Sequence, residues 1–228
     1  MRFKSLNIYL RRIVTVLICL FITSFSCLAG DYFKKDKLVF DFYSPNWVNT
    51  PNEILSDYKK SFGFSFSWGE DVQIKKSLFS IYYGIGYDYN SVTSNAKLLK
   101  PSLPFGHPDN FKWSSLSESY DVNKLKLHYL DVPFQFRFKT ETNLPFRVYL
   151  GTKVGYLFSS NYSKETESNE SESRKNLSEI NRLRYGITFR MGYGMFNIFS
   201  YYGLNNLIST NQDKRINQFS LGLSLLLN

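Results

Sequence analysis

The chain has 228 residues, with 28 Lys or Arg against 19 Asp or Glu and a formal net charge of +9. The mean hydropathy is −0.28. Beyond the N-terminus no uncharged apolar run reaches the ~18 residues of a spanning helix, which excludes a helical membrane bundle. Both cysteines, Cys19 and Cys27, lie near the N-terminus. The rest of the chain can therefore form neither a disulfide nor a thiolate metal site.

The N-terminal segment predicts a secretory signal peptide over residues 1–29, followed by one domain over residues 30–228. Its positive start contains Arg2, Lys4, Arg11 and Arg12. An apolar run follows over residues 13–25, and Cys27-Leu28-Ala29 gives a small-residue cleavage site before Gly30. The alternatives are a retained membrane anchor and a lipid on Cys27, although Ser24 stands where a lipobox has Leu.

Cleavage would leave a milder charge. Removing the four basic residues gives 28 − 4 = 24 basic against 19 acidic residues, a net charge of +5. No Lys/Arg cluster is interleaved with aromatic residues in the manner of nucleic-acid-binding proteins. We therefore expect no nucleic-acid partner.

Eight segments of the remaining chain alternate between large apolar and small or polar side chains. Because a β-strand sends successive side chains to opposite faces, this period of two predicts strands. They span residues 38–42, 62–68, 79–89, 130–138, 146–158, 183–193, 196–204 and 218–225. In the fifth segment, Phe146, Val148 and Leu150 begin the apolar face, and Arg147 and Gly151 belong to the other.

The composition of the two faces indicates a membrane barrel. The apolar face carries the bulkiest side chains, and the other carries Gly, Ser and isolated charges, as a narrow barrel lumen requires. The exposed face of a soluble sandwich is instead usually rich in Lys, Glu and Thr. The aromatic content of 18% fits the aromatic girdles of such barrels. We therefore expect an all-β fold, an eight-stranded antiparallel up-and-down transmembrane β-barrel.

The connections between the segments support the same topology. The gaps after the first, third and fifth segments are long, at residues 44–60, 90–121 and 159–181. Those after the second, fourth and sixth are short, at residues 69–77, 140–145 and 192–195. Short periplasmic turns alternating with longer outer loops are typical of outer-membrane barrels. The last outer loop, near residues 209–215, is short but polar.

The fourth segment contains two irregularities. Leu125, Leu127 and Tyr129 have the opposite parity from the apolar face that begins at Leu130. This predicts a strand that protrudes above the membrane, with a bulge near Tyr129–Leu130. Pro133 falls on the lumen face and lacks a ladder donor, so we expect a local irregularity there.

Several stretches resemble a known family. They are Tyr129-Leu130-Asp131-Val132-Pro133-Phe134, Tyr149-Leu150-Gly151 to Gly155-Tyr156-Leu157, Arg184-Tyr185-Gly186 to Gly192-Tyr193-Gly194, and Phe219-Ser220-Leu221-Gly222-Leu223. From the third predicted strand onward the chain resembles the PorT-like outer-membrane β-barrel family of Bacteroidetes-type bacteria. The resemblance implies an eight-stranded outer-membrane barrel, in a family of which one branch is linked to secretion and gliding machinery. The chain departs from the terminal aromatic residue common in barrel-assembly signals elsewhere, because it ends in Leu226-Leu227-Asn228.

Charged residues on the predicted lumen face form the main candidate site. They are Asp41, Asp88, Asp131, Arg137, Arg147, Lys153, Arg184 and Arg190. An unpaired charge away from water costs several kcal/mol, so we expect these residues to pair across the interior. The network would fill and fix a closed lumen; the alternative is a proton or ion gate. An eight-stranded barrel is just wide enough for its own side chains, which disfavours a diffusion pore.

A second candidate site is a surface of the outer loops, where Trp47, His107 and Trp113 are predicted to lie. They would form a recognition surface for a ligand or partner, or anchor the loops at the interface. An enzyme with a site at the rim would need a general base, for which His107 and His128 are the only histidines. No spacing singles out a catalytic set. We therefore predict no catalytic residue, no metal site and no cofactor.

These expectations combine into one interpretation. The chain is expected to be an integral outer-membrane protein of a Gram-negative-type bacterium with a structural or interaction role. Its loops would act as a binding surface, or the barrel would belong to an envelope or secretion complex. The expected partners are outer-membrane lipid, lipopolysaccharide and envelope proteins. A small specific channel is the alternative function, ahead of a rim-site enzyme.

Overall fold

The computed structural model describes residues 35–50, 54–75, 77–99, 112–115, 120–166, 171–208 and 216–227. The expected signal peptide at residues 1–29 and the loop residue His107 lie outside these ranges. The described residues contain no helix long and apolar enough to cross a membrane.

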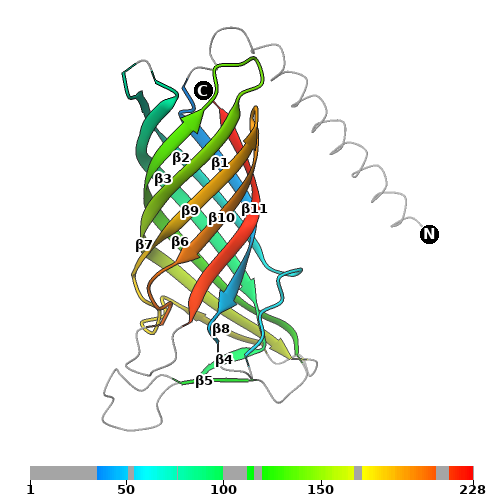
Figure 1. The fold of residues 1–228 in the computed structure, drawn as a ribbon. Helices are drawn as coiled ribbons and strands as arrows, with labels where there is room; N and C mark the ends of the chain where they lie inside the picture. Colours follow the sequence, from blue (N-terminus) through cyan, green and yellow to red (C-terminus); the bar gives the residue numbers. More distant parts are fainter. Residues whose placement is uncertain are drawn as a thin grey trace, which may run out of the picture.

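Eight strands close into one antiparallel barrel (Figure 1). They are β1 (Leu38–Val48), β2 (Phe62–Gln73), β3 (Phe79–Thr93), β6 (Tyr120–Lys139), β7 (Phe146–Thr166), β9 (Leu183–Tyr193), β10 (Phe196–Gly203) and β11 (Asn217–Leu227). Each pairs with the next around the ring, and β11 pairs with β1 to complete it. The predicted eight-stranded up-and-down barrel is therefore confirmed.

Burial along the strands confirms the predicted orientation of the two faces. On β7, Arg147 and Lys153 are buried, whereas Leu150, Val154 and Tyr156 on the opposite parity are exposed. Strand β9 shows the same alternation between exposed and buried positions from Leu183 to Met191. The large apolar side chains thus form an outward band, as a lipid bilayer requires of a spanning barrel.

The two ends of the barrel differ. Short turns join β2 to β3, β6 to β7 and β9 to β10, at residues 74–78, 140–145 and 194–195. The start of β1 and the end of β11 belong to this end too, because Leu38 lies opposite Leu227. The other end carries the long connections, which in outer-membrane barrels face outward from the cell. We therefore take the short-turn end as periplasmic.

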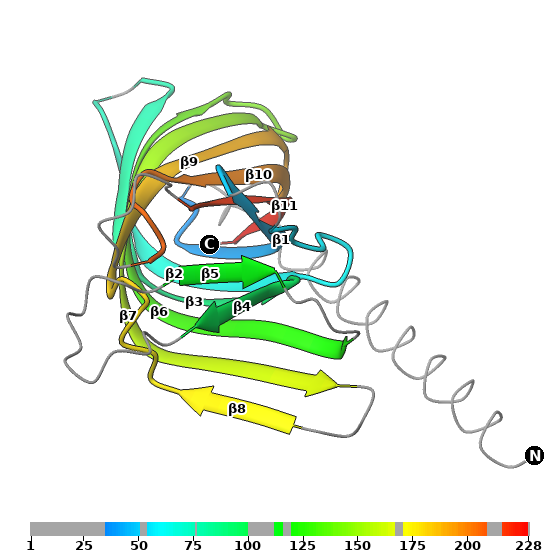
Figure 2. The same cartoon turned by 90° about the horizontal axis from the view of Figure 1, so that it is seen from below.

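Three further strands lie at the extracellular end (Figures 1 and 2). Strands β4 (Ala96–Leu99) and β5 (Lys112–Ser115) form a hairpin, and β8 (Ser171–Lys175) pairs with the far part of β7. The sequence predicted only loops here. Strands β6 and β7 have 20 and 21 residues, about twice what a tilted strand needs to span a bilayer. Together with β8 they project beyond the barrel.

Strand β6 protrudes as expected, and a bulge lies beside Tyr129 as predicted, but its extra residue belongs to the facing strand β7 and not to β6. From Asn123 onward strand β6 keeps one parity, and the extra residue lies in β7: His128 pairs with Ser159 and Tyr129 with Leu157, which leaves Phe158 without a partner on β6. The direction of the β6 side chains does not change; their surroundings do. Within the bilayer the inside is polar, and above it the inside becomes an apolar core.

This apolar core closes the extracellular mouth of the barrel, and we call it the cap. Its buried residues are Trp47, Ile54, Val92, Ala96, Leu125, Leu127, Tyr129, Leu157, Tyr162, Leu177, Ile180, Leu207, Ile208 and Ile216. The pKa of the Tyr162 hydroxyl is raised to about 12, mainly by burial and to a smaller extent by the negative charge of Glu172. The hydroxyl is therefore neutral at physiological pH.

The irregularity expected at Pro133 is present in the ladder between β3 and β6. Tyr83 pairs with Phe134, and the ladder resumes with Gly86 opposite Asp131, without a change of register. Because proline has no N–H to donate, the hydrogen-bond ladder between β3 and β6 is interrupted next to Pro133.

Candidate functional site: the charged lumen

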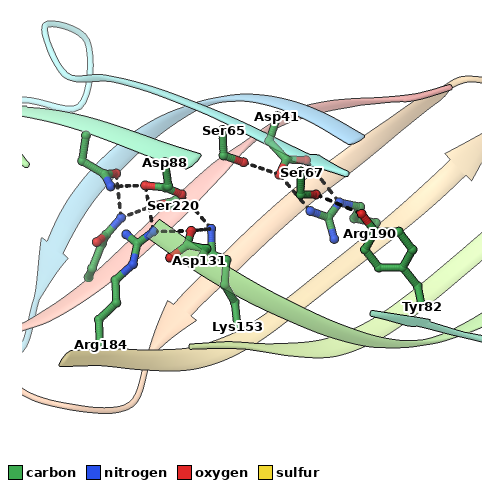
Figure 3. A network of polar contacts seen from close by, with 12 residues as sticks. Asp41, Ser65, Ser67, Tyr82, Asp88, Asp131, Lys153, Arg184, Arg190 and Ser220 are labelled. Atoms are coloured by element: carbon green, nitrogen blue, oxygen red, sulfur yellow. Dashed lines mark hydrogen bonds and ion pairs between the residues drawn. The ribbon is translucent and has the colours of Figure 1, made fainter. Parts of the chain in front are cut away.

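Charged side chains are buried in the lumen between the periplasmic end and the cap, and Figure 3 shows the part of this network around Asp41 and Asp88. The buried carboxylates of this region are Asp36, Asp41, Asp71, Asp88 and Asp131, and the buried cations are Arg137, Arg147, Lys153, Arg184 and Arg190. Five negative and five positive groups therefore balance among the fully buried residues, and the partly buried Lys139 also lies 3.5 Å from Asp36. A balanced, paired set is what makes burial of so many charges tolerable.

The layer nearest the periplasm is centred on Asp36, which is fully buried. Arg147 binds its carboxylate through two nitrogens, at 3.0 and 3.1 Å. The Tyr149 hydroxyl donates to the same carboxylate. Beside it, Arg137 pairs with Asp71 at 3.2 Å and donates to the backbone carbonyl of Asp36 at 2.8 Å. This layer ties the residue that precedes β1 to the far wall of the barrel.

The middle layer is a single bidentate pair. Arg190 Nη2 lies 2.8 Å from Asp41 Oδ2, and its Nε lies 3.2 Å from Oδ1. The Ser65 hydroxyl donates to Asp41 at 2.7 Å, and Arg190 Nε also donates to the Ser224 hydroxyl at 3.2 Å. The bidentate geometry is the strong form of an Arg–carboxylate bond.

The outer layer joins two carboxylates and two cations in a ring. Arg184 lies 2.8 Å from Asp88 and 2.7 Å from Asp131. Lys153 lies 2.7 Å from Asp88 and 3.4 Å from Asp131. Each cation thus bridges both carboxylates, which cancels the repulsion that two buried carboxylates would otherwise exert.

Aromatic rings cover the guanidinium groups. The Arg137 guanidinium lies 3.8 Å from the ring centre of Tyr82 and 4.7 Å from that of Tyr149. Arg184 lies 3.8 Å from the ring of Tyr129, where the outer layer meets the cap. Cation–π contacts of this kind are worth ~2 kcal/mol when desolvated. They also fill the lumen volume that the ion pairs leave.

Two small spaces lie inside the described lumen. One lies between the middle and outer layers, beside Asp41 and Lys153, and another lies beneath the cap, beside Tyr129 and Arg184. Each holds about 10 Å³, room for about one water molecule. Neither is large enough to carry a hydrated solute.

The structure places all eight sequence-predicted lumen charges inside the barrel, but it pairs them partly with other residues. Asp41, Asp88 and Asp131 contact Arg190, Lys153 and Arg184. Arg137 and Arg147 instead contact Asp71 and Asp36, which were not predicted. Asp71 has the same parity as Ser65 and Ser67. Extending the second predicted strand from residue 68 to residue 71 would have identified Asp71 as a lumen residue. Asp36 precedes the first strand, and no alternation signals it.

The predicted loop surface differs from the structure. Trp47 lies in β1, with its side chain 5% exposed in the cap, because β1 continues beyond its membrane-facing part and its inward positions there are apolar. Trp113 lies in β5, whose pairing with β4 orders that part of the loop. His107 lies outside the described residues. Trp47 thus offers no exposed recognition surface.

His128 lies on the outer face of β6 among aromatic residues. Its Nδ1 shares a hydrogen bond of 2.8 Å with the Tyr87 hydroxyl. Its ring also packs against Tyr89 and Phe158, at 5.0 and 6.0 Å between ring centres. These contacts place it in the outer aromatic girdle.

The chain matches a protein-family model and has a distant likeness to solved structures. A family model described as outer membrane protein beta-barrel domain matches residues 38–209. No curated protein matches the sequence. Among solved structures, Ail, the attachment invasion locus protein of Yersinia pestis, is similar at 15% identity and a TM-score of 0.37, covering 85% of this chain and 98% of Ail. The same protein in complex with the heparin analogue sucrose octasulfate matches at 14% identity, a TM-score of 0.36 and the same coverage.

Proposed function

Since this chain belongs to the outer membrane protein beta-barrel domain family, we propose that it serves the outer membrane as a structural or binding component rather than as a pore. The family places it in the outer membrane of a Gram-negative-type bacterium. The single observation that supports the proposal is the filled lumen, with three layers of paired charges beneath an apolar cap.

Conduction would require this filling to move. Opening the outer layer would separate Asp88 and Asp131 from Arg184 and Lys153, and each uncompensated buried charge costs several kcal/mol. The cap above it would also have to expose apolar side chains to water. A narrow channel is therefore the less favoured alternative.

The projecting strands supply the surface for an interaction role. Strand β8 ends the order of strands in the main sheet, so within the described residues its outer edge pairs with no strand. Glu172, Ser173 and Lys175 on this strand are exposed. An unpaired strand edge can accept an extended segment of a partner by main-chain hydrogen bonds. We propose this edge as the site of contact with an envelope or external protein.

The sequence supports a subfamily, a signal peptide and a place in an envelope complex as further parts of this proposal. The motifs that resemble the PorT-like family support membership of that branch and a place in a secretion or envelope complex. The signal peptide at residues 1–29 and the domain at residues 30–228 fit export to the outer membrane. Lipopolysaccharide would surround the projecting strands. No catalytic role is proposed for His107 or His128.

Two measurements test the proposal. In planar bilayers the purified protein should give no stable conductance, and a stable large conductance would refute the filled lumen. For the binding role, a photo-crosslinking amino acid at Ser173 should give a discrete adduct in cells. The control is the same group at Glu141, which is exposed at the periplasmic turn. Equal adduct patterns from both positions would contradict a binding surface at β8.

A further inference from the structure

The barrel wall splits on the extracellular part of β7. Strand β9 pairs with β7 only as far as Tyr156 opposite Leu183, and β8 begins to pair at Asn161 opposite Lys175. Between these two points lies a groove of about 320 Å³, which we call the rim groove. Its lining residues are Tyr156, Leu157, Phe158, Ser159, Ser160, Asn176, Leu177 and Arg182.

Main-chain hydrogen bonds fix both ends of the rim groove. At the end nearer the membrane, the Leu157 N–H donates to the Arg182 carbonyl at 2.7 Å. At the far end, the Asn176 N–H donates to the Ser160 carbonyl at 2.8 Å, and the Leu177 N–H donates to the Ser160 hydroxyl at 2.7 Å. The β7 bulge at Phe158 lies between them. The groove is therefore bounded by hydrogen-bonded backbone, on β7 at one side and on the connection from β8 to β9 at the other.

The rim groove lies at the level of lipid headgroups. Tyr156 and Phe158 are the outermost exposed side chains of the apolar band on β7. Beyond the bulge the outer face of the neighbouring strand β6 carries Lys126 and Lys124. Aromatic residues mark the interface between the hydrocarbon core and the headgroups. The opening of the rim groove therefore faces the headgroup region of the outer leaflet.

The lining combines apolar walls with basic rims. Phe158 and Leu177 contribute apolar surface, and Ser159 and Asn176 contribute polar groups. Arg182 is exposed and donates to the Tyr156 hydroxyl at 3.5 Å.

A second cation stands on the opposite flank. On β6, His128 lies opposite the lining residue Ser159, and Lys126 lies opposite Asn161; Lys126 does not line the groove but lies on the strand next to it, across β7 from Arg182. Among the described residues neither Arg182 nor Lys126 forms an ion pair, and the nearby Glu179 is already paired with Arg174. Both cations are therefore available to a ligand.

We propose that the rim groove binds the phosphate-bearing headgroup of an outer-leaflet lipid. Arg182 and Lys126 hold the phosphate, since a guanidinium and an ammonium are the usual phosphate partners in proteins. Phe158 and Leu177 pack against the first carbons of the acyl chains. A volume of about 320 Å³ suits a headgroup with its nearest chain atoms. Anionic lipids are preferred because no described acid next to the groove is free to bind a headgroup amine.

The test is lipid retention by the full barrel, measured by native mass spectrometry from detergent. The probes are phosphatidylglycerol, lipid A and phosphatidylcholine, with inorganic phosphate as a competitor. The double variant Arg182→Gln/Lys126→Gln removes both cations. Lys59→Gln is the matched control, because it removes an exposed cation at the same end, in the β1–β2 connection on the opposite side of the ring. Ser159→Trp keeps the charges and fills the groove. The gel shift on heating checks that each variant is folded.

We expect the wild-type protein and Lys59→Gln to retain phosphatidylglycerol or lipid A about tenfold more tightly than phosphatidylcholine. The double variant should lose this preference, and Ser159→Trp should lose retention altogether. Retention of only one of the two anionic lipids would support the site and identify its source. Equal retention of phosphatidylcholine, or a double variant that behaves as Lys59→Gln does, would overturn the proposal. Displacement by equimolar inorganic phosphate would overturn it in favour of a simple anion site.

Discussion

The Asp41–Arg190 pair allows a direct measurement of what burial does to a lumen ion pair. Both side chains are less than 5% exposed and lie 2.8 Å apart. The Lys37–Glu70 pair at the periplasmic rim has nearly the same distance, 2.9 Å, but its side chains are 39% and 46% exposed. The two pairs therefore differ mainly in their access to water.

The expected effects differ by several kcal/mol. At an effective dielectric constant of about 20, charges 2.8 Å apart attract each other by about 6 kcal/mol. Replacing Arg190 with Met leaves the Asp41 carboxylate buried with the Ser65 hydroxyl as its hydrogen-bond donor, and we expect a loss of about 3–5 kcal/mol in the free energy of unfolding. Replacing Lys37 with Met should cost less than about 1 kcal/mol, because water solvates the partner.

The measurement is reversible urea unfolding in detergent micelles, followed by tryptophan fluorescence and by the gel shift on heating. A double variant, Asp41→Asn/Arg190→Met, should recover most of the loss, because the amide oxygen can still accept the Ser65 hydroxyl. If Arg190→Met and Lys37→Met destabilise the barrel equally, the lumen is hydrated and the inferred occlusion is wrong.

Three further predictions follow from the packing. Gly155→Ala places a methyl group against a carboxylate oxygen of the outer layer and should cost about 1–3 kcal/mol, whereas Gly203→Ala, whose nearest atoms lie 3.4 Å away, should change the unfolding free energy little. In variants that keep one tryptophan, bromine-labelled acyl chains should quench Trp68, which is 56% exposed, but not Trp47; equal quenching would contradict the orientation of the barrel wall. Leu127→Ala should destabilise the cap by about 2–5 kcal/mol in the same urea assay and give no conductance in planar bilayers, since the charged layers still close the lumen.

The strands were predictable because the bilayer imposes one rule on every spanning residue. Outward positions such as Leu150 and Ile187 must be apolar, and inward positions such as Gly155 and Arg190 fill a narrow space. Only closure of the ring leaves no strand edge in lipid, so the topology followed from the pattern.

The extracellular part was harder to predict because one pattern has two physical causes. Leu125 and Leu127 have the opposite parity from the lipid-facing residues that begin at Leu130. A bulge in this strand would produce that pattern, and so would a strand without a bulge whose inner face passes from a polar lumen into an apolar core. The structure shows a change of surroundings, with the bulge in the facing strand at Phe158. Trp47 was placed in a loop for the same reason, since outward Ser44 and Asn46 end the apolar alternation.

The charged lumen was predictable only for residues on spanning strands. Asp88 and Lys153 lie between apolar neighbours of opposite parity, which marks them as inward. Asp36 lies before the first strand and reaches Arg147 across the barrel, a distance of 111 positions in sequence. No local pattern encodes such a contact, because it depends on how the closed ring places β7 across the lumen from the start of β1.

Because β1 pairs with β11, the same closed ring of strands could form with the described chain ends placed at a different turn. Leu38 and Leu227 lie opposite each other in neighbouring antiparallel strands at the periplasmic end. A linker of a few residues could therefore connect the described ends in the manner of the existing turns, and the ring could be opened instead at the turn of residues 194–195 between β9 and β10. Circularly permuted versions of the chain should then reach the same closed barrel, with the last strand to emerge from the ribosome no longer β11.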